Sequence, residues 1–197
     1  MPVRFSRARG AARCAVAALV LAAPADGADE RPDFSGKWTL APKISDDIQT
    51  RIEEATGRSQ VKGAGGLGLL PRAGAEREAE RMELRRFLLD RVTLFESLEI
   101  EQSPADIKIV HGAEDVRIFY FDREHVRNDR QGRKLRCRTR WDGPRLVIEE
   151  EGEDRTRIVD VLVLVPSRSQ LVHGLRVESR TLEKPLELNL AYDKVTP

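Results

Sequence analysis

The spacing of hydrophobic residues differs between two parts of the chain. From residue 45 to about residue 94 the apolar residues recur at helical spacing. The residues expected on the buried helix faces are Ile48, Ile52 and Ala55, followed by Leu84, Phe87, Leu88 and Val92. In a short segment at 36–40, and again after residue 95, apolar and polar residues alternate with a period of two. The pattern predicts one strand, then two amphipathic helices, then a series of strands.

The predicted helices form an insertion at about 45–94. The first helix begins near Ser45, whose hydroxyl can cap it, and ends at Gly57. The second runs from about Ala75 to Val92, with glutamates early and arginines late, as the helix dipole favours.

Turn residues such as Pro, Gly, Asn and Asp separate the predicted strands. These strands are 36–40, 96–101, 106–111, 115–122, 134–141, 145–151, 155–165, 169–180 and 185–194. Consecutive short strands joined by tight turns favour a meander, which exposes fewest edges when it closes on itself. The predicted fold class is therefore mainly β: an antiparallel up-and-down β-barrel with a two-helix insertion after the first strand.

The pattern also predicts the register of one hairpin. With Asp142 and Gly143 as the two central residues of a type I′ turn, Cys137 lies opposite Ile148. One face of this hairpin is then charged and the other is mostly apolar, as expected for a sheet with one buried side.

The first 25 residues follow a different pattern. A stretch with four arginines precedes an apolar run of about ten residues that ends in small residues, which is typical of a secretory signal. The run is too short to span a bilayer as a helix. Ala23-Pro24-Ala25 is the best cleavage site, so a single exported domain is predicted at 26–197. Cys14 precedes the apolar run, which argues against a lipid-modified cysteine. The predicted location is periplasmic or secreted, with no transmembrane span.

Charge and cysteine content narrow the classes of partner. Removing the leader takes four arginines from 34 basic residues and leaves 30 against 33 acidic residues, a net charge of −3. Both signs are interspersed, so neither nucleic acid nor an anionic membrane is favoured as a partner. Only Cys137 remains in the exported chain, which excludes an internal disulfide.

The exported chain opens with the run FSGKWTLAPKISD at 34–46. This run resembles the opening FSGTWxLxxxKSD of small exported bacterial proteins described as lipocalin-like. Further matches to that family lie at 98–102, in the hairpin at 139–149 and at 192–195. The resemblance implies a barrel in which Gly36 permits a close approach of the chain. It also implies that Trp38 plugs the closed end under a basic side chain. It implies no particular activity or ligand.

Candidate chemistry is sparse. His111, His125 and His173 fall in three different elements without zinc-ligand spacing. The run Gly63-x-Gly65-x-x-Gly68 follows polar residues rather than the buried strand of a dinucleotide-binding fold. No catalytic residue, metal ligand or cofactor is predicted.

Three further residue types have structural interpretations. His173 alternates with Leu171 and Leu175, so we expect it to face the barrel and to have a hydrogen-bond partner. Cys137 lies on the inner face of its strand, where burial raises rather than lowers the pKa of a thiol. The adjacent glutamates at 149–151 point to alternate faces of a strand and form no catalytic pair.

Three functions remain open. The first is a non-enzymatic protein that binds a small apolar or amphipathic ligand in the barrel; its candidate lining residues are Trp38, Phe87, Tyr120 and His173. The stripe of the second helix then covers the barrel mouth. The second is an envelope protein–protein interaction module with a filled barrel, whose contact surface is the insertion with the apolar loop Leu67–Pro71. The third is a hydrolase or isomerase that uses His173 with a barrel carboxylate.

Overall fold

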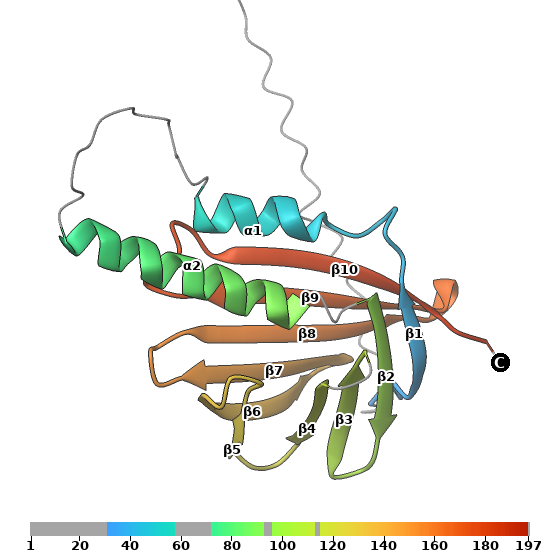
Figure 1. The fold of residues 1–197 in the computed structure, drawn as a ribbon. Helices are drawn as coiled ribbons and strands as arrows, with labels where there is room; N and C mark the ends of the chain where they lie inside the picture. The colour runs from blue at the N-terminus through green and yellow to red at the C-terminus, as the bar shows by residue number, and fades with distance from the viewer. Residues whose placement is uncertain (1–30, 58–71, 93–95, 113–114, 197) are drawn as a thin grey trace, which may run out of the picture.

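The computed structural model describes residues 31–57, 72–92, 96–112 and 115–196. The predicted leader, the glycine motif at 63–68 and the loop Leu67–Pro71 lie outside the described residues. Within them the chain forms ten antiparallel strands and two helices (Figure 1). The predicted fold class, a mainly-β antiparallel barrel with a two-helix insertion after the first strand, is confirmed.

The helices and strands follow one another in a simple order. After β1 (Gly36–Leu40) come α1 (Ile48–Thr56) and α2 (Arg72–Val92). The remaining strands are β2 (Ser97–Gln102), β3 (Asp106–His111), β4 (Asp115–Tyr120), β5 (His125–Asn128), β6 (Lys134–Asp142), β7 (Arg145–Gly152), β8 (Arg157–Val165), β9 (Gln170–Glu178) and β10 (Leu186–Lys194). A short 3-10 helix, Pro166–Arg168, joins β8 to β9.

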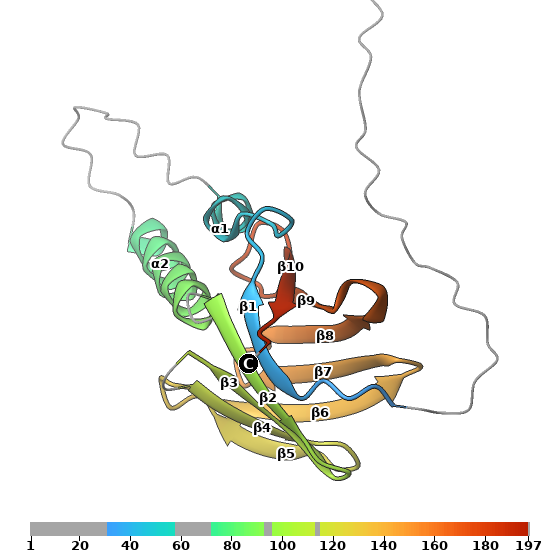
Figure 2. The same ribbon diagram turned by 90° about the vertical axis from the view of Figure 1, so that its right-hand side faces the viewer.

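The ten strands form one sheet that closes almost completely into a barrel. Their order is β4-β3-β2-β1-β10-β9-β8-β7-β6-β5, so β4 and β5 are the two edges. The two edges lie side by side in Figures 1 and 2. Among the described residues they are joined by a side chain rather than a strand ladder, because His125 Nε2 donates to the carbonyl oxygen of Ile118 at 3.0 Å.

The strand β5 is absent from the sequence prediction of nine strands. It has only four residues, His-Val-Arg-Asn, and a single apolar side chain, so it carries no alternating signal. It pairs with β6 over its whole length, from His125 opposite Cys137 to Asn128 opposite Lys134. The longer neighbour therefore imposes the extended conformation.

The register predicted for the β6–β7 hairpin is wrong by two residues. Cys137 lies opposite Glu150 rather than Ile148, and the central turn residues are Gly143 and Pro144. Pro144 has no N–H, so it cannot close a turn centred on Asp142 and Gly143. Gly143 takes a φ of +57°, and the fixed φ of a following proline suits a type II′ turn. A shift of two leaves each side chain on its predicted face but brings a carboxylate opposite Cys137.

The two helices lie on the same side of the barrel (Figure 2). The cap of α1 is Asp47 rather than Ser45, because an Asp47 carboxylate oxygen accepts from the backbone N–H of Thr50 at 2.7 Å. The Ser45 hydroxyl instead accepts from the backbone N–H of Ala191 in β10. The predicted stripe of α2 is buried in the core, at Leu84, Phe87, Leu88 and Val92. This stripe packs against the buried side chains of the barrel.

Candidate functional site

A belt of buried charged residues crosses the barrel interior beneath α2. Its members come from one helix and four strands, and we refer to them as the ionic belt: Arg91, Asp115, Arg117, Arg127, Glu150 and Asp160. The period of two turns each strand residue inward, while Arg91 enters from the last turn of α2. Three arginines are therefore matched by three carboxylates in the largely buried interior.

Arg91 links the helix to the barrel wall. Its Nη1 lies 2.8 Å from Glu150 Oε2 in β7, and its Nη2 donates to Asp160 Oδ2 in β8, also at 2.8 Å. Both carboxylates and the guanidinium are almost completely buried. Such a pair is stable only because each charge has its partner in place.

Two further arginines complete the ionic belt from the edge strands. Arg127 of β5 donates through Nε to the second oxygen of Glu150 at 2.5 Å. Arg117 of β4 donates through Nε to Asp115 Oδ2 at 2.8 Å. Glu150 therefore joins α2 and the edge strand β5 to β7, whereas Arg117 pairs with Asp115 within β4.

His173 and His111 adjoin the ionic belt. His173 Nε2 lies 2.8 Å from Asp160 Oδ1, so the predicted barrel-facing histidine has the hydrogen-bond partner expected for it. Burial and the nearby Arg117 hold the pKa of His111 well below its usual value, so this imidazole is neutral at pH 7. The described chain thus places a histidine–aspartate pair inside the barrel.

Charge pairing sets the protonation of the carboxylates. Burial alone would raise the pKa of Glu150, but Arg91 and Arg127 hold it below its usual value. Burial is likewise outweighed at Asp160, whose pKa is lowered by Arg91 and by the hydrogen bond from His173. Both residues are therefore ionised at neutral pH. Burial, reinforced by the charge of Glu150, raises the pKa of Cys137 to about 12, which excludes a thiolate nucleophile.

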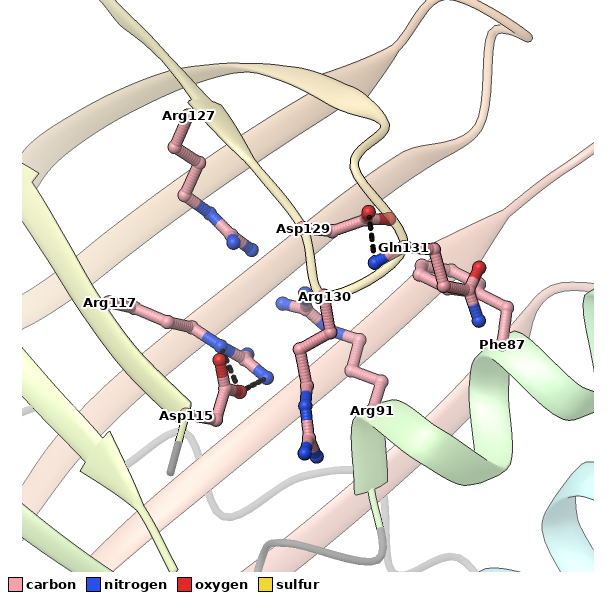
Figure 3. A pocket seen from close by; sticks show the side chains of 8 residues that line it. All are labelled: Phe87, Arg91, Asp115, Arg117, Arg127, Asp129, Arg130 and Gln131. Carbon is pink, nitrogen blue, oxygen red and sulfur yellow. Dashed lines mark hydrogen bonds and ion pairs between the residues drawn. The ribbon is translucent and has the colours of Figure 1, made fainter. Parts of the chain in front are cut away.

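A pocket lies where α2, β4 and the β5–β6 turn meet. Its lining residues are Phe87, Arg91, Asp115, Arg117, Arg127, Asp129, Arg130 and Gln131. Figure 3 shows the four arginine side chains converging on this space from different elements. Arg130 and Gln131 are exposed, so the pocket reaches the surface. Its volume is about 30 Å³, which is room for about two water molecules.

A second cavity lies deeper and shares Arg117 with the first. Its walls are mostly apolar, with the polar groups at one side; the apolar residues are Leu98, Ile100, Ile109, Phe119, Ile148 and Leu162. Its volume is about 10 Å³. Elsewhere in the core, the hydroxyls of Thr139 and Tyr192 are buried and have no hydrogen-bond partner among the described residues. Unpartnered buried hydroxyls are uncommon in folded proteins.

The four candidate lining residues fall in different places. Phe87 lines the first pocket, and the Arg133 guanidinium lies 3.7 Å from its ring centre. His173 lines the second cavity. Trp38 is 2 % exposed in the core, where its Nε1 donates to the carbonyl oxygen of Phe34 at 3.0 Å. The structure therefore brings only Phe87 and His173 to the two cavities.

Tyr120 does not line the interior. It shares the outer face of β4 with the exposed residues Val116 and Ile118, and the inward position beside it belongs to Phe119. The guanidinium of Arg123 lies 3.9 Å from the centre of its ring. This placement follows from the alternation of side chains along β4, because adjacent residues of a strand point to opposite faces.

The residues implied to have structural roles lie together at one end of the barrel. Gly36 has a φ of +139°, and a Cβ at this position would come within 3.0 Å of Lys194 Cε. The Lys194 ammonium lies 5.3 Å from the ring centre of Trp38. This arrangement has the close approach and the basic cover that the resemblance implies.

The sequence reasoning missed the ionic belt, although two signals were present. Asp160 alternates with Ile158 and Leu162, so it occupies an inward position of an apolar strand. Arg91 follows Leu84 by seven residues and Leu88 by three, which places it on the apolar stripe of α2. A charged residue at a core position indicates either a buried partner or a functional site.

The described part of the chain contains no metal-binding cluster and no membrane-spanning helix. There, no three His, Cys, Asp or Glu side chains are grouped so that they could bind a metal ion. Neither α1 nor α2 has an apolar stretch long enough to cross a lipid bilayer.

No family model matches the sequence, and no curated protein matches it. Similar folds occur among solved structures. Lipid binding protein 8 from Caenorhabditis elegans is 13 % identical, with a TM-score of 0.50, over 82 % of this chain and 95 % of that one. The REP1-NXSQ fatty acid transporter is 14 % identical, with a TM-score of 0.48, over 83 % and 96 %. Secretory abundant heat soluble protein 4 from Ramazzottius varieornatus is 10 % identical, with a TM-score of 0.48, over 82 % and 94 %.

Proposed function

We propose that this protein is an exported, non-catalytic binding protein that takes up a small amphipathic molecule beneath α2. The observation that carries the proposal is the pair of adjoining cavities. The outer one is lined by four arginines and Phe87, the inner one is mostly apolar, and Arg117 belongs to both. A ligand with a polar head and an apolar body fits this arrangement, with its head in the outer cavity and its body in the inner one.

The chemistry of the outer pocket favours an anionic head group. Arginine presents a planar set of donors that suits a carboxylate or a phosphate. Arg91, Arg117 and Arg127 have carboxylate partners, so a bound anion competes with those carboxylates for the guanidinium groups. Arg130 is exposed at the rim of the pocket. Deeper in the barrel, the hydroxyls of Thr139 and Tyr192 offer hydrogen bonds that no described residue uses.

Uptake requires α2 or its side chains to move. Ligand pockets commonly measure about 300–1,000 Å³, and the cavities of about 30 and 10 Å³ are far smaller. The contacts that must yield are those of Phe87 with Arg133 and of Arg91 with Glu150 and Asp160. We expect binding to be accompanied by displacement of the last turns of α2.

Replacing Phe87 with Ala should weaken the binding of an apolar fluorescent probe. The ring forms one wall of the outer pocket, and its loss removes contact area where the ligand is proposed to enter. Titration of the probe, well below the melting midpoint of each protein, measures the change. Leu84→Ala is the matched control, because Leu84 is buried on the same stripe of α2 but does not line the pocket. Equal affinity in wild type and Phe87→Ala would remove this proposed route of uptake.

The alternative function, an envelope interaction module with a filled barrel, is favoured by one observation. The ion-paired residues of the belt occupy the interior and leave only small cavities. A lipid and hydrophobic-dye binding screen separates the two functions, since an interaction module binds no probe while remaining folded by circular dichroism. Such a protein would instead co-purify with a partner from the envelope fraction.

Export is proposed from the basic and apolar leader. We expect the protein to begin at Asp26, or within a few residues of it, and to carry no lipid. N-terminal sequencing and intact-mass measurement on the envelope fraction test this expectation. A retained leader, or a mass increment equal to a diacyl group, would contradict it.

The remaining hypothesis, catalysis by His173 with a carboxylate, has less support. His173 and Asp160 do form a hydrogen-bonded pair, but Asp160 is also bound by Arg91, and the adjoining cavity has room for about one water molecule. The similarity to lipid binding protein 8 concerns the fold alone, at 13 % identity. The non-catalytic proposal therefore rests on the chemistry of the cavities.

A further inference from the structure

An exposed apolar surface lies on the outside of the two edge strands. Val116 and Ile118 of β4 are 53 % and 41 % exposed, and Val126 of β5 is 62 % exposed. The contact of His125 with Ile118 brings the two strands together, and the Tyr120 ring packs against His125 with ring centres 4.9 Å apart. Three of the large apolar side chains that are exposed in the described residues thus share one part of the surface.

A row of basic residues borders this apolar surface. Alternate positions of β6 hold Lys134, Arg136, Arg138 and Arg140, and all four are exposed. Arg136 lies directly opposite Val126 in the β5–β6 ladder. We call the apolar residues of β4 and β5, together with this row, the β4–β6 face.

The charges of the β4–β6 face are mostly positive and only partly neutralised. Arg138 and Arg140 form ion pairs with Glu124 and Glu149. Lys134 and Arg136 form no ion pair with any residue that the structure describes. The exposed β4–β5 turn adds Arg123 against Asp122 and Glu124. A chain whose exported form has more acidic than basic residues therefore carries a basic row on β6, since the period of two brings these four side chains to one side of the strand. Glu149 and Glu151 of β7 lie opposite Arg138 and Arg136, so the row is most positive at Lys134, next to β5.

We propose that the β4–β6 face docks the protein on an anionic lipid surface. Exposed valine and isoleucine side chains beside a tyrosine suit the boundary between head groups and acyl chains, and lysines and arginines beside them suit lipid phosphates. The apolar residues favour lipid over nucleic acid, whose backbone offers them no partner. The face lies outside the barrel, so docking does not depend on the proposed ligand.

Sedimentation with lipid vesicles tests the proposal. We expect the purified protein to bind vesicles of phosphatidylglycerol mixed with phosphatidylcholine, to bind phosphatidylcholine alone far more weakly, and to dissociate as salt is raised. Lys134→Gln with Arg136→Gln should lower binding by about 25-fold, which corresponds to about fivefold for each basic residue near the surface. Val126→Ser with Ile118→Ser should lower it at least several-fold.

The control is Lys43→Gln with Ile44→Ser, which removes an exposed basic and an exposed apolar residue from the loop after β1. All of these side chains are exposed, so the variants should keep the wild-type melting midpoint. Lack of binding to phosphatidylglycerol vesicles by the folded protein, or equal loss in the control, would overturn the proposal. If Val126→Ser with Ile118→Ser leaves vesicle binding unchanged, and an oligonucleotide displaces the protein from the vesicles, the face would be assigned to nucleic acid. Probe binding inside the barrel is measured separately, so failure of either proposal is recognised independently.

Discussion

Trp38→Ala should destabilise the protein by about 3–5 kcal/mol, through lost burial and the cavity left behind. Trp38 is 2 % exposed, donates a hydrogen bond to Phe34 and lies beneath Lys194. For a domain of this size the melting midpoint should fall by roughly 6–20 °C. Thermal unfolding followed by circular dichroism measures the change.

Trp38→Phe provides the comparison for this prediction. It keeps most of the apolar ring but loses the N–H, so it should cost clearly less than Trp38→Ala. A Trp38→Ala protein that melts within a degree or two of wild type would mean that β1 does not hold its side chain in the core.

Arg91→Leu should be comparably destabilising, by about 3–5 kcal/mol, because it leaves buried carboxylates without their shared cation. Glu150 would still have Arg127 as a partner, and Asp160 would still have His173. Both carboxylates would lose the Arg91 guanidinium, which joins them in the wild-type protein. Urea unfolding of the variant measures the loss. Adding Asp160→Asn removes the carboxylate that has lost its guanidinium partner, without disturbing the Arg127–Glu150 pair, and should restore part of the stability.

Arg85→Leu is the matched control on the same helix. Arg85 is partly exposed and lies 3.5 Å from Glu53, whose side chain is half exposed, so the ion pair contributes about 0–1 kcal/mol. If Arg91→Leu and Arg85→Leu were equally mild, α2 would not be fixed to the barrel through Arg91.

The fold was largely predictable because its inward positions repeat regularly. Alternation in segments such as Ile158–Leu162 and helical spacing from Leu84 to Val92 report burial directly, and burial fixes both strands and helices. Prediction from the local sequence failed where a neighbouring strand, or a missing backbone N–H group, determines the structure. β5 is extended because β6 pairs with it, and the β6–β7 turn is displaced because Pro144 lacks an N–H.

The candidate site was much less predictable. Phe87 and His173 could be assigned to the interior from spacing alone, but the partners of a buried charge come from strands far apart in sequence. Glu150 meets Arg91 and Arg127 only after the barrel closes. The basic row of the β4–β6 face is easier to predict, because its residues occupy alternate positions of β6 and therefore share one side of the strand.

The position of β1 determines when the barrel can be completed. β1 lies between β2 and β10, so Thr39 is opposed by Ser97 on one side and by Asp193 on the other. Closing the sheet thus joins segments separated by nearly the whole chain, a type of contact that forms slowly and late in folding. The core around Trp38 lacks one wall until the residues up to Lys194 are available. If the chain is exported from its N-terminus, as proposed above, the barrel cannot be completed until its last strand has crossed the membrane.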